Sequence, residues 1–231
     1  MGIVNHIKKT VKKIITPVRW YDLRKTQPVS SIFGLDRGIP IDRYYIENFI
    51  SANKDTIKGE VLEIGDSTYS KKYGNPNFMN YQVLSYSKED PDVTIIGDLT
   101  EHSSLPANTI DCFICTQTFN FIYDFQKAME GAYLLLKNDG VLLATVGGIS
   151  QISRFDMDRW GDFWRFTTKS TMTAFGKVFG EANVIVESYG NVLSAIAFLE
   201  GISAGELKNE ELDYRDENYQ LLITIRAVKK Y

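Results

Sequence analysis

The chain has 231 residues, of which 44% are hydrophobic, and its net charge is −3 at pH 7. This length suits one α/β domain with small additions, and the charge provides no general attraction to nucleic acid. No run of about 18 apolar residues predicts a membrane span. Lysine pairs interrupt the N-terminal stretch where a secretory signal needs an apolar core. We therefore expect a cytoplasmic protein that does not bind nucleic acid.

Residues 1–33 are predicted to form a basic amphipathic extension. Apolar residues recur at helical spacing on one side of residues 3–18, lysines lie largely opposite, and Pro17 stops the helix. Two interpretations stay open: the helix packs on its own domain, or it binds a partner or the anionic inner face of a membrane. The apolar stripe is Ile3, Ile7, Val11, Ile14, Ile15 and Val18, and the lysines are Lys8, Lys9, Lys12 and Lys13.

A charged, glycine-containing loop over residues 34–45 leads into a predicted helix at 42–52, with Asp42 as its N-cap. This loop contains two arginines and two tyrosines. It either clamps an anionic or aromatic ligand or forms ordinary surface ion pairs.

Residues 59–67 are predicted to form a buried first strand followed by a tight turn. In open α/β sheets, ligands bind at the carboxyl ends of the strands. Gly65 allows close approach of the backbone to a ligand, and Glu63 can hold a polar or cationic part of it. A purely structural turn is the alternative.

Later elements follow in an alternating order that predicts a parallel sheet with helices on both faces. The helix at 124–137 is expected to end at Gly140 in a left-handed cap. Cys112 and Cys115 lie three positions apart in one strand, so they point to opposite faces and stay reduced. We predict a short helix within 69–80, strands at 81–86, 93–96, 110–116, 140–146, 184–189 and 221–228, helices at 169–179 and 190–206, and an acidic loop at 209–218.

The segment at 148–168, which we name the lid segment, mixes charged and large aromatic residues without a helical or strand period. Such a mixture directly after a strand favours a lid or substrate wall over the strand ends. A structural loop with arginine–aspartate pairs and tryptophan anchors is the alternative.

Four stretches resemble class I S-adenosylmethionine-dependent methyltransferases: VLEIGD at 61–66, IIGDLT at 95–100, IDCFICTQTFNFI at 110–122 and LLLKNDGVLLATV at 134–146. The resemblance covers residues 34–231, the predicted methyltransferase domain. It implies a Rossmann-like sheet of seven mostly parallel strands, with helices on both faces and an antiparallel last strand. The stretches DRGIPIDRYYIENFI at 36–50 and GISQISRFDMDRWGDFWRFT at 148–167 are similar to a bacterial branch associated with glycosyltransferases and polysaccharide assembly.

This resemblance implies S-adenosylmethionine as the cofactor and S-adenosylhomocysteine as its product. Two departures from the family pattern concern the cofactor site: only Gly65 follows the first strand, and Ser87 stands where an acid usually binds the ribose hydroxyls. A hydroxyl binds them more weakly than a carboxylate does. The implied cofactor residues are Arg37, Arg43, Tyr44, Glu63, Gly65, Asp66, Ser67, Ser87, Asp98, Leu99, Thr116, Gln117 and Thr118.

We expect O-methylation of a saccharide or related small molecule in surface-glycan biosynthesis, with no metal site. Asp156, Asp158 and Asp162 are candidates for the base, and Arg159 and Trp160 for acceptor binding. The expected partners are this acceptor and, through the basic helix, a glycosyltransferase or the membrane surface. Two alternatives remain: an N- or other small-molecule methyltransferase, and a catalytically degenerate partner protein.

Overall fold

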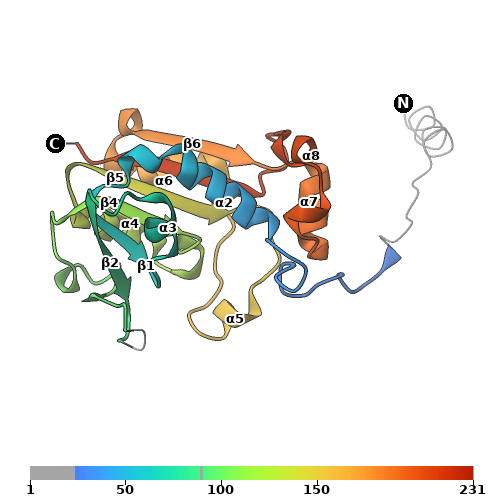
Figure 1. Cartoon of the computed structure of the whole chain (residues 1–231), viewed down its shortest axis with the longest axis horizontal. Helices are drawn as coiled ribbons and strands as arrows, with labels where there is room; N and C mark the ends of the chain where they lie inside the picture. Colours follow the sequence, from blue (N-terminus) through green and yellow to red (C-terminus); the bar gives the residue numbers. More distant parts are fainter. Residues whose placement is uncertain (1–23, 89–90, 231) are drawn as a thin grey trace, which may run out of the picture.

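A computed structural model describes residues 24–88 and 91–230 of the chain. Its seven strands form one sheet with the order β3-β2-β1-β4-β5-β7-β6. Strands β1 to β5 run parallel to one another (Figure 1). Strand β7 is antiparallel to both β5 and β6. The predicted fold class is therefore confirmed. The strands are β1 (Gly59–Ile64), β2 (Met79–Ser85), β3 (Ile95–Ile96), β4 (Ile110–Thr116), β5 (Leu136–Gly147), β6 (Val184–Tyr189) and β7 (Leu222–Val228).

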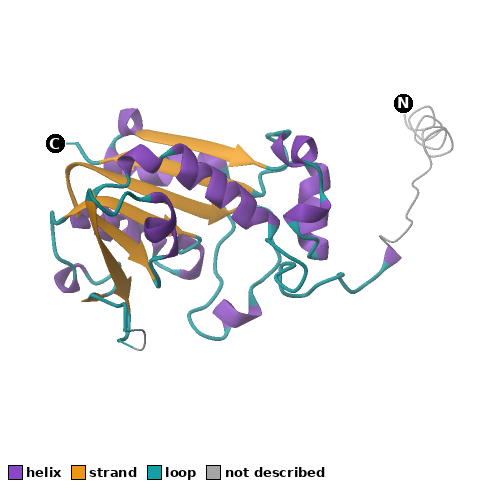
Figure 2. Cartoon of the chain, in the orientation of Figure 1, coloured by secondary structure: helices purple, strands orange, loops and turns teal. Residues whose placement is uncertain are grey.

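Helices cover both faces of this sheet, as Figure 2 shows. Helices α4 (Phe125–Leu135) and α6 (Thr168–Phe179) pack in the core on one face. Helices α2 (Ile41–Ala52), α3 (Thr68–Tyr73), α7 (Val192–Glu200) and α8 (Asn209–Asp213) contribute to the core on the other face. The short α5 (Arg154–Met157) lies in the lid segment. Within the described ranges, no helix is long and apolar enough to cross a membrane.

The central strand β4 is buried on both faces, which is the reason for its continuous apolar sequence. Cys112 belongs to the core on one face, whereas Cys115 belongs to the core on the other. Both thiols are free and buried, and burial raises the pKa of each to about 12. The prediction of two reduced thiols on opposite faces is confirmed.

The end of α4 differs from the prediction. The helix stops at Leu135, and β5 begins at Leu136 without a glycine cap. Asp139, rather than Gly140, has the left-handed backbone, with φ of 64°. The turn is held from outside, because the Lys229 amide donates to the Gly140 carbonyl and the Lys229 carbonyl accepts from the Asp139 amide, each at 2.9 Å. A contact with the far end of the chain thus replaces the predicted local cap.

Three further local predictions were wrong in detail. Asp42 is not the N-cap of α2, because the helix begins at Ile41 and Pro40 occupies the cap position. The third strand is confined to Ile95–Ile96. The predicted acidic loop begins with α8, which forms because Leu212 is buried in the core. The predicted helix over residues 3–18 lies outside the described residues.

Candidate functional site

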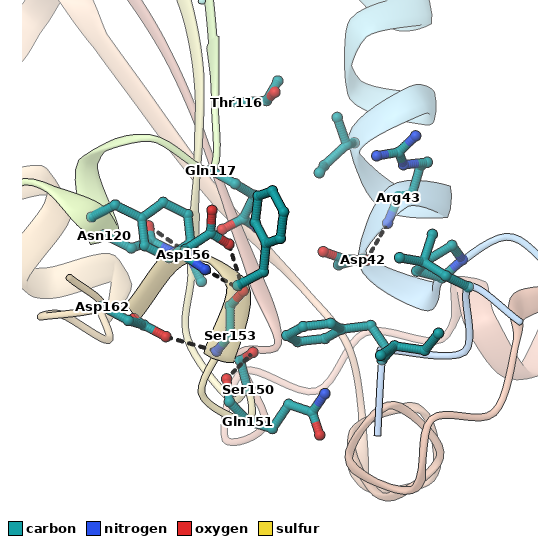
Figure 3. Close-up of a pocket in the computed structure, with 18 of the residues that line it drawn as sticks. Asp42, Arg43, Thr116, Gln117, Asn120, Ser150, Gln151, Ser153, Asp156 and Asp162 are labelled. Carbon is teal, nitrogen blue, oxygen red and sulfur yellow. Dashed lines mark hydrogen bonds between the residues drawn. The ribbon is translucent and has the colours of Figure 1, made fainter. Parts of the chain in front are cut away.

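A cavity of about 550 Å³ lies at the carboxyl ends of β1, β4 and β5. Residues 31–46 and the lid segment complete its walls. Figure 3 shows Asp42 and Arg43 of α2 on one side, and Ser153 and Asp156 on the other. The topology explains this position, because the parallel strands all end at the same edge of the sheet. Seven predicted site residues line the cavity: Arg43, Glu63, Asp66, Thr116, Gln117, Asp156 and Asp162.

Glu63 joins the end of β1 to the beginning of α3. Its carboxylate accepts hydrogen bonds from the Tyr69 amide at 3.0 Å, the Ser70 amide at 2.8 Å and the Ser70 hydroxyl. Burial raises the pKa of Glu63, and these hydrogen bonds partly offset the effect. The side chain therefore anchors α3 and also presents a carboxylate to the cavity.

The turn between Glu63 and α3 is open toward a ligand. Gly65 has a φ of 79°, a conformation that favours glycine, and no atom lies within 4 Å of the place where a Cβ would be. The Asp66 carboxylate accepts from the Thr68 amide at 2.8 Å, which fixes the turn. Ser67 is buried at the N-cap of α3 and does not line the cavity.

Asp42 places a second carboxylate at the cavity. Its Oδ1 accepts from the Arg43 amide at 2.8 Å, and burial raises the pKa of Asp42 to about 6. No ion pair among the described residues involves Asp42. Together with Glu63, it makes this part of the wall attractive to a cationic group. From the sequence we predicted Asp42 only as a cap, although its place in the charged stretch before α2 was a usable signal.

A buried amide connects the exits of β4 and β5. The Asn120 side chain donates to Gln117 Oε1 at 2.8 Å and accepts from the Gly147 amide at 3.3 Å. Gln117 has a φ of 49°, which is strained for a residue other than glycine. Its amide donates to the Thr145 carbonyl at 2.9 Å, so the strained turn is fixed by β5. Asn120 was not predicted, since no local pattern indicates that it would meet Gly147.

A pair of charged side chains stabilises the shape of the lid segment. Asp162 receives two hydrogen bonds from the Arg165 guanidinium, at 2.5 and 2.9 Å, and one from the Ser153 amide at 3.0 Å. Burial by itself raises the pKa of Asp162, but the Arg165 hydrogen bonds and charge and the Ser153 amide outweigh it, so the net shift is downward. All of these contacts tie the two ends of the lid loop together.

Asp156 presents a carboxylate to the cavity from the lid. Its Oδ2 accepts from the Ser153 hydroxyl at 2.5 Å, and its Oδ1 accepts from the indole of Trp160 at 3.3 Å. Asp158 instead pairs with Arg154 at 3.4 Å on the exposed surface. Of the three predicted lid acids, Asp156 and Asp162 line the cavity and Asp158 does not.

A second hollow of about 590 Å³ lies beside the first, and the aromatic residue Phe121 lines both. Its walls include Arg159 and Trp160, and the Trp160 ring lies nearly parallel to that of Tyr86, with ring centroids 6.4 Å apart. Burial and the nearby Asp98 charge raise the pKa of Tyr86. The lid segment thus reaches the residue that follows β2.

Asp98 and Leu99 form the turn after β3. The Asp98 carboxylate accepts from the amide and the hydroxyl of Thr100, at 2.7 and 2.8 Å. Leu99 is buried in the core. Ser87 is exposed after β2, and the Thr118 hydroxyl donates to the Thr116 carbonyl. None of these four predicted cofactor residues lines the cavity at the ends of β1, β4 and β5.

Arg37 and Tyr44, predicted to cap the cofactor, contact the C-terminal third of the chain. Arg37 forms two hydrogen bonds with Glu206, at 2.9 and 2.5 Å. The Tyr44 hydroxyl donates to Asp213 at 2.8 Å. The structure brings neither side chain into the wall of the cavity.

Comparison with known proteins identifies the fold. A family model described as a methyltransferase domain matches residues 73–144. Comparison with curated proteins finds no match. The CurJ carbon methyltransferase structure has a TM-score of 0.53 and 14% identity, covering 86% of this chain and 57% of that one.

Two further structures are similar to the chain. A SAM-dependent methyltransferase from Archaeoglobus fulgidus has a TM-score of 0.53 and 13% identity, covering 81% of this chain and 94% of that one. Phosphoethanolamine N-methyltransferase 2 from Haemonchus contortus, in complex with S-adenosyl-L-methionine, has a TM-score of 0.50 and 15% identity, covering 87% of this chain and 60% of that one. The chain thus spans less than two thirds of the carbon and phosphoethanolamine methyltransferases. It has the Rossmann-like methyltransferase fold, and residues 73–144 match the methyltransferase-domain model.

Proposed function

We propose that this protein is an S-adenosylmethionine-dependent methyltransferase that methylates a hydroxyl of a saccharide or related small molecule. The observation that carries the proposal is the cavity at the ends of β1, β4 and β5, with Asp42 and Glu63 in its walls and Asp156 on the lid side. The A. fulgidus and H. contortus structures, named for or crystallised with S-adenosylmethionine, support the choice of cofactor.

The residues present suit this cofactor. S-adenosylmethionine, when bound, supplies an electrophilic methyl group on a positively charged sulfur. Asp42 and Glu63 provide negative charge for a cationic ligand in a partly desolvated wall, where charge attraction is stronger than in water. The open space beside Gly65 leaves room for the ligand against the backbone.

Asp156 is the lid acid best suited to hold the acceptor. Its carboxylate lines the cavity, where it can accept the hydrogen bond of a hydroxyl and take the proton. Asp162 is less suited to that role, because it is 1% exposed and its charge is paired with Arg165, whereas Asp156 accepts from the neutral Ser153 hydroxyl and Trp160 indole. The contribution of Asp162 is to fix the shape of the lid loop that carries Asp156, which helps to orient the acceptor.

A saccharide is proposed as the acceptor because of the lid and the resemblance of residues 36–50 and 148–167 to the polysaccharide-assembly branch. The rings of Trp160, Tyr86 and Phe163 line the second hollow, and a sugar ring can pack on such surfaces. An amine or carbon acceptor is the alternative. It is supported by the two similar structures that are named as a carbon methyltransferase and an N-methyltransferase.

One observation favours a different class of function, a methyltransferase-fold partner protein without catalysis. Ser87 is exposed at the end of β2 and offers only a hydroxyl where a carboxylate usually binds the ribose. Such a protein would act in a glycan-assembly complex and would not bind the cofactor.

Calorimetric titration separates these functions. We expect micromolar binding of S-adenosylmethionine and S-adenosylhomocysteine, weakened about tenfold by Asp42→Asn, because one carboxylate–cation contact is worth about 1.4 kcal/mol or more. Asp158→Asn, which removes the charge of a lid acid outside the cavity, is the matched control and should bind as the unmodified protein does. Absence of binding at millimolar cofactor by folded protein would reject the enzyme and leave the partner protein.

A further inference from the structure

Helix α7 has an exposed apolar side. Its outward side chains follow the i, i+1, i+4, i+7 spacing of one helix face, and each is between 38% and 48% exposed. The opposite side packs in the core through Ala197 and Phe198. An exposed apolar helix face of this kind is a candidate interaction surface. We name it the α7 apolar face: Val192, Leu193, Ile196 and Leu199.

The first described residues of the chain lie beside this face. A hollow of about 370 Å³ is lined by residues 25–28 on one side and by Ile196 and Leu199 on the other. Farther along, the Ser30 amide donates to the Glu200 carbonyl at 3.0 Å. In Figure 1 the blue beginning of the described chain runs near α7. Whatever precedes residue 24 therefore enters next to the α7 apolar face.

The preceding 23 residues have the composition that this surface requires. Their apolar stripe, from Ile3 to Val18, matches an apolar face, and they carry five basic residues against one acid. Residues 206–217 carry six acids against two basic residues, and they include α8. Helix α8 adjoins α7, since the Asn191 side chain donates to the Glu211 carbonyl at 2.7 Å. The opposite charges of residues 1–23 and 206–217 favour docking with the lysines near α8.

We propose that residues 1–23 dock within the same molecule on the α7 apolar face, with their lysines toward the acidic α8 segment. This docking fixes residues 24–35. Phe33 of that stretch packs on Phe198, with ring centroids 5.7 Å apart, and residues 31–33 line the cavity at the ends of β1, β4 and β5. The N-terminal segment thus acts as a strap that holds one wall of the candidate site.

Hydrogen exchange of the full chain tests the strap, read at the amides of residues 30–35 and 192–200. Val11→Asp places a charge in the middle of the apolar stripe, whereas Asn5→Asp adds the same charge on the polar side and is the matched control. We expect Val11→Asp to speed exchange at both sites about tenfold or more, because it replaces an apolar side chain of the contact with a charge. Asn5→Asp should leave exchange unchanged.

A second variant tests the surface itself. Ile196→Asp should speed exchange of residues 30–35 as Val11→Asp does, and combining the two should add nothing, because each already releases the strap. Ile185→Asp, on an exposed residue of β6 away from α7, is its control. An additive double variant would overturn the proposal.

Three further outcomes would also overturn it. Equal exchange in Val11→Asp and the unmodified chain would show that the stripe does not cover α7. Protection that rises with protein concentration and is insensitive to Val11→Asp would assign the face to a second copy. Protection of α7 that appears only with phosphatidylserine vesicles would assign it to a membrane. None of these readouts depends on cofactor binding.

Discussion

Asp162 and Arg165 form a two-point ion pair at the root of the lid segment, with Nη–Oδ distances of 2.5 and 2.9 Å. The Asp162 side chain is 1% exposed and also accepts the Ser153 amide, so it joins residues on both sides of α5. Arg165 extends the connection to the Gln151 carbonyl at 2.7 Å. The lid is thereby built as a closed loop rather than a free one.

Asp162→Asn should loosen this loop. The amide that replaces the carboxylate loses one acceptor for Arg165. We expect the free energy of unfolding to fall by about 1–3 kcal/mol, which is less than for a fully buried pair because Arg165 is partly exposed. Asp158→Asn, which breaks only the exposed pair with Arg154, should change it by less than about 0.5 kcal/mol. Urea unfolding measures both, and an equal effect of the two variants would contradict the anchoring role.

The lowered pKa of Asp162 sets the sign of its pH dependence. The folded state releases this proton more readily than the unfolded chain does, so the contribution to stability is present above the ordinary aspartate pKa and is lost as the pH falls through the lowered value. The stability difference between the unmodified protein and Asp162→Asn should therefore shrink in acid.

Asp42 should have the opposite dependence. The folded protein holds its proton up to about pH 6, whereas an exposed aspartate loses it near pH 3.9. The stability of the unmodified protein should therefore fall relative to Asp42→Asn as the pH rises through this interval. At pH 8 the variant is expected to unfold at a higher temperature yet bind the cationic cofactor more weakly, a trade between stability and function. Equal melting temperatures from pH 4 to pH 8 would contradict this.

Gly131 should not tolerate a side chain. It lies in α4, where an added Cβ would overlap the carbonyl oxygen of Leu99 in the turn after β3. We expect Gly131→Ala to lower the free energy of unfolding by about 1–3 kcal/mol, because the backbone must shift. Gly205→Ala, at a position with no neighbour within 4 Å of the added Cβ, should be neutral within about 0.5 kcal/mol. A neutral Gly131→Ala would mean that α4 moves freely against this turn.

Arg37→Gln tests whether Arg37 belongs to the cofactor site, as the sequence predicted, or lies outside it, as the lining of the cavity indicates. The Arg37 guanidinium pairs with Glu206, and both side chains are 36% exposed. We expect cofactor affinity to change by less than about twofold in this variant and stability by at most about 1 kcal/mol. Calorimetric titration beside Asp42→Asn provides the comparison. A tenfold loss of affinity would return Arg37 to the cofactor site.

Sequence patterns predicted well those strands whose own residues are apolar because the strand is buried. Strand β4 was predicted with its bounds because both of its faces are apolar, and β6 likewise was found in place. The end of α4 was mispredicted because its turn takes hydrogen bonds from Lys229, about 90 residues away along the sequence, which no local pattern contains. The same reason limited the prediction of α8, which depends on the burial of Leu212.

For the candidate site, the sequence by itself determined the edge of the sheet where it lies, since acids and glycines at the ends of parallel strands converge there. It also singled out the lid, through the unusual mixture of charges and rings. Only the tertiary structure decided which side chains face the cavity. It placed Asp42 there and paired Arg37 and Tyr44 with Glu206 and Asp213, each 169 residues away. Long-range ion pairs and burial, rather than residue type, decide whether a charged side chain is available to a ligand.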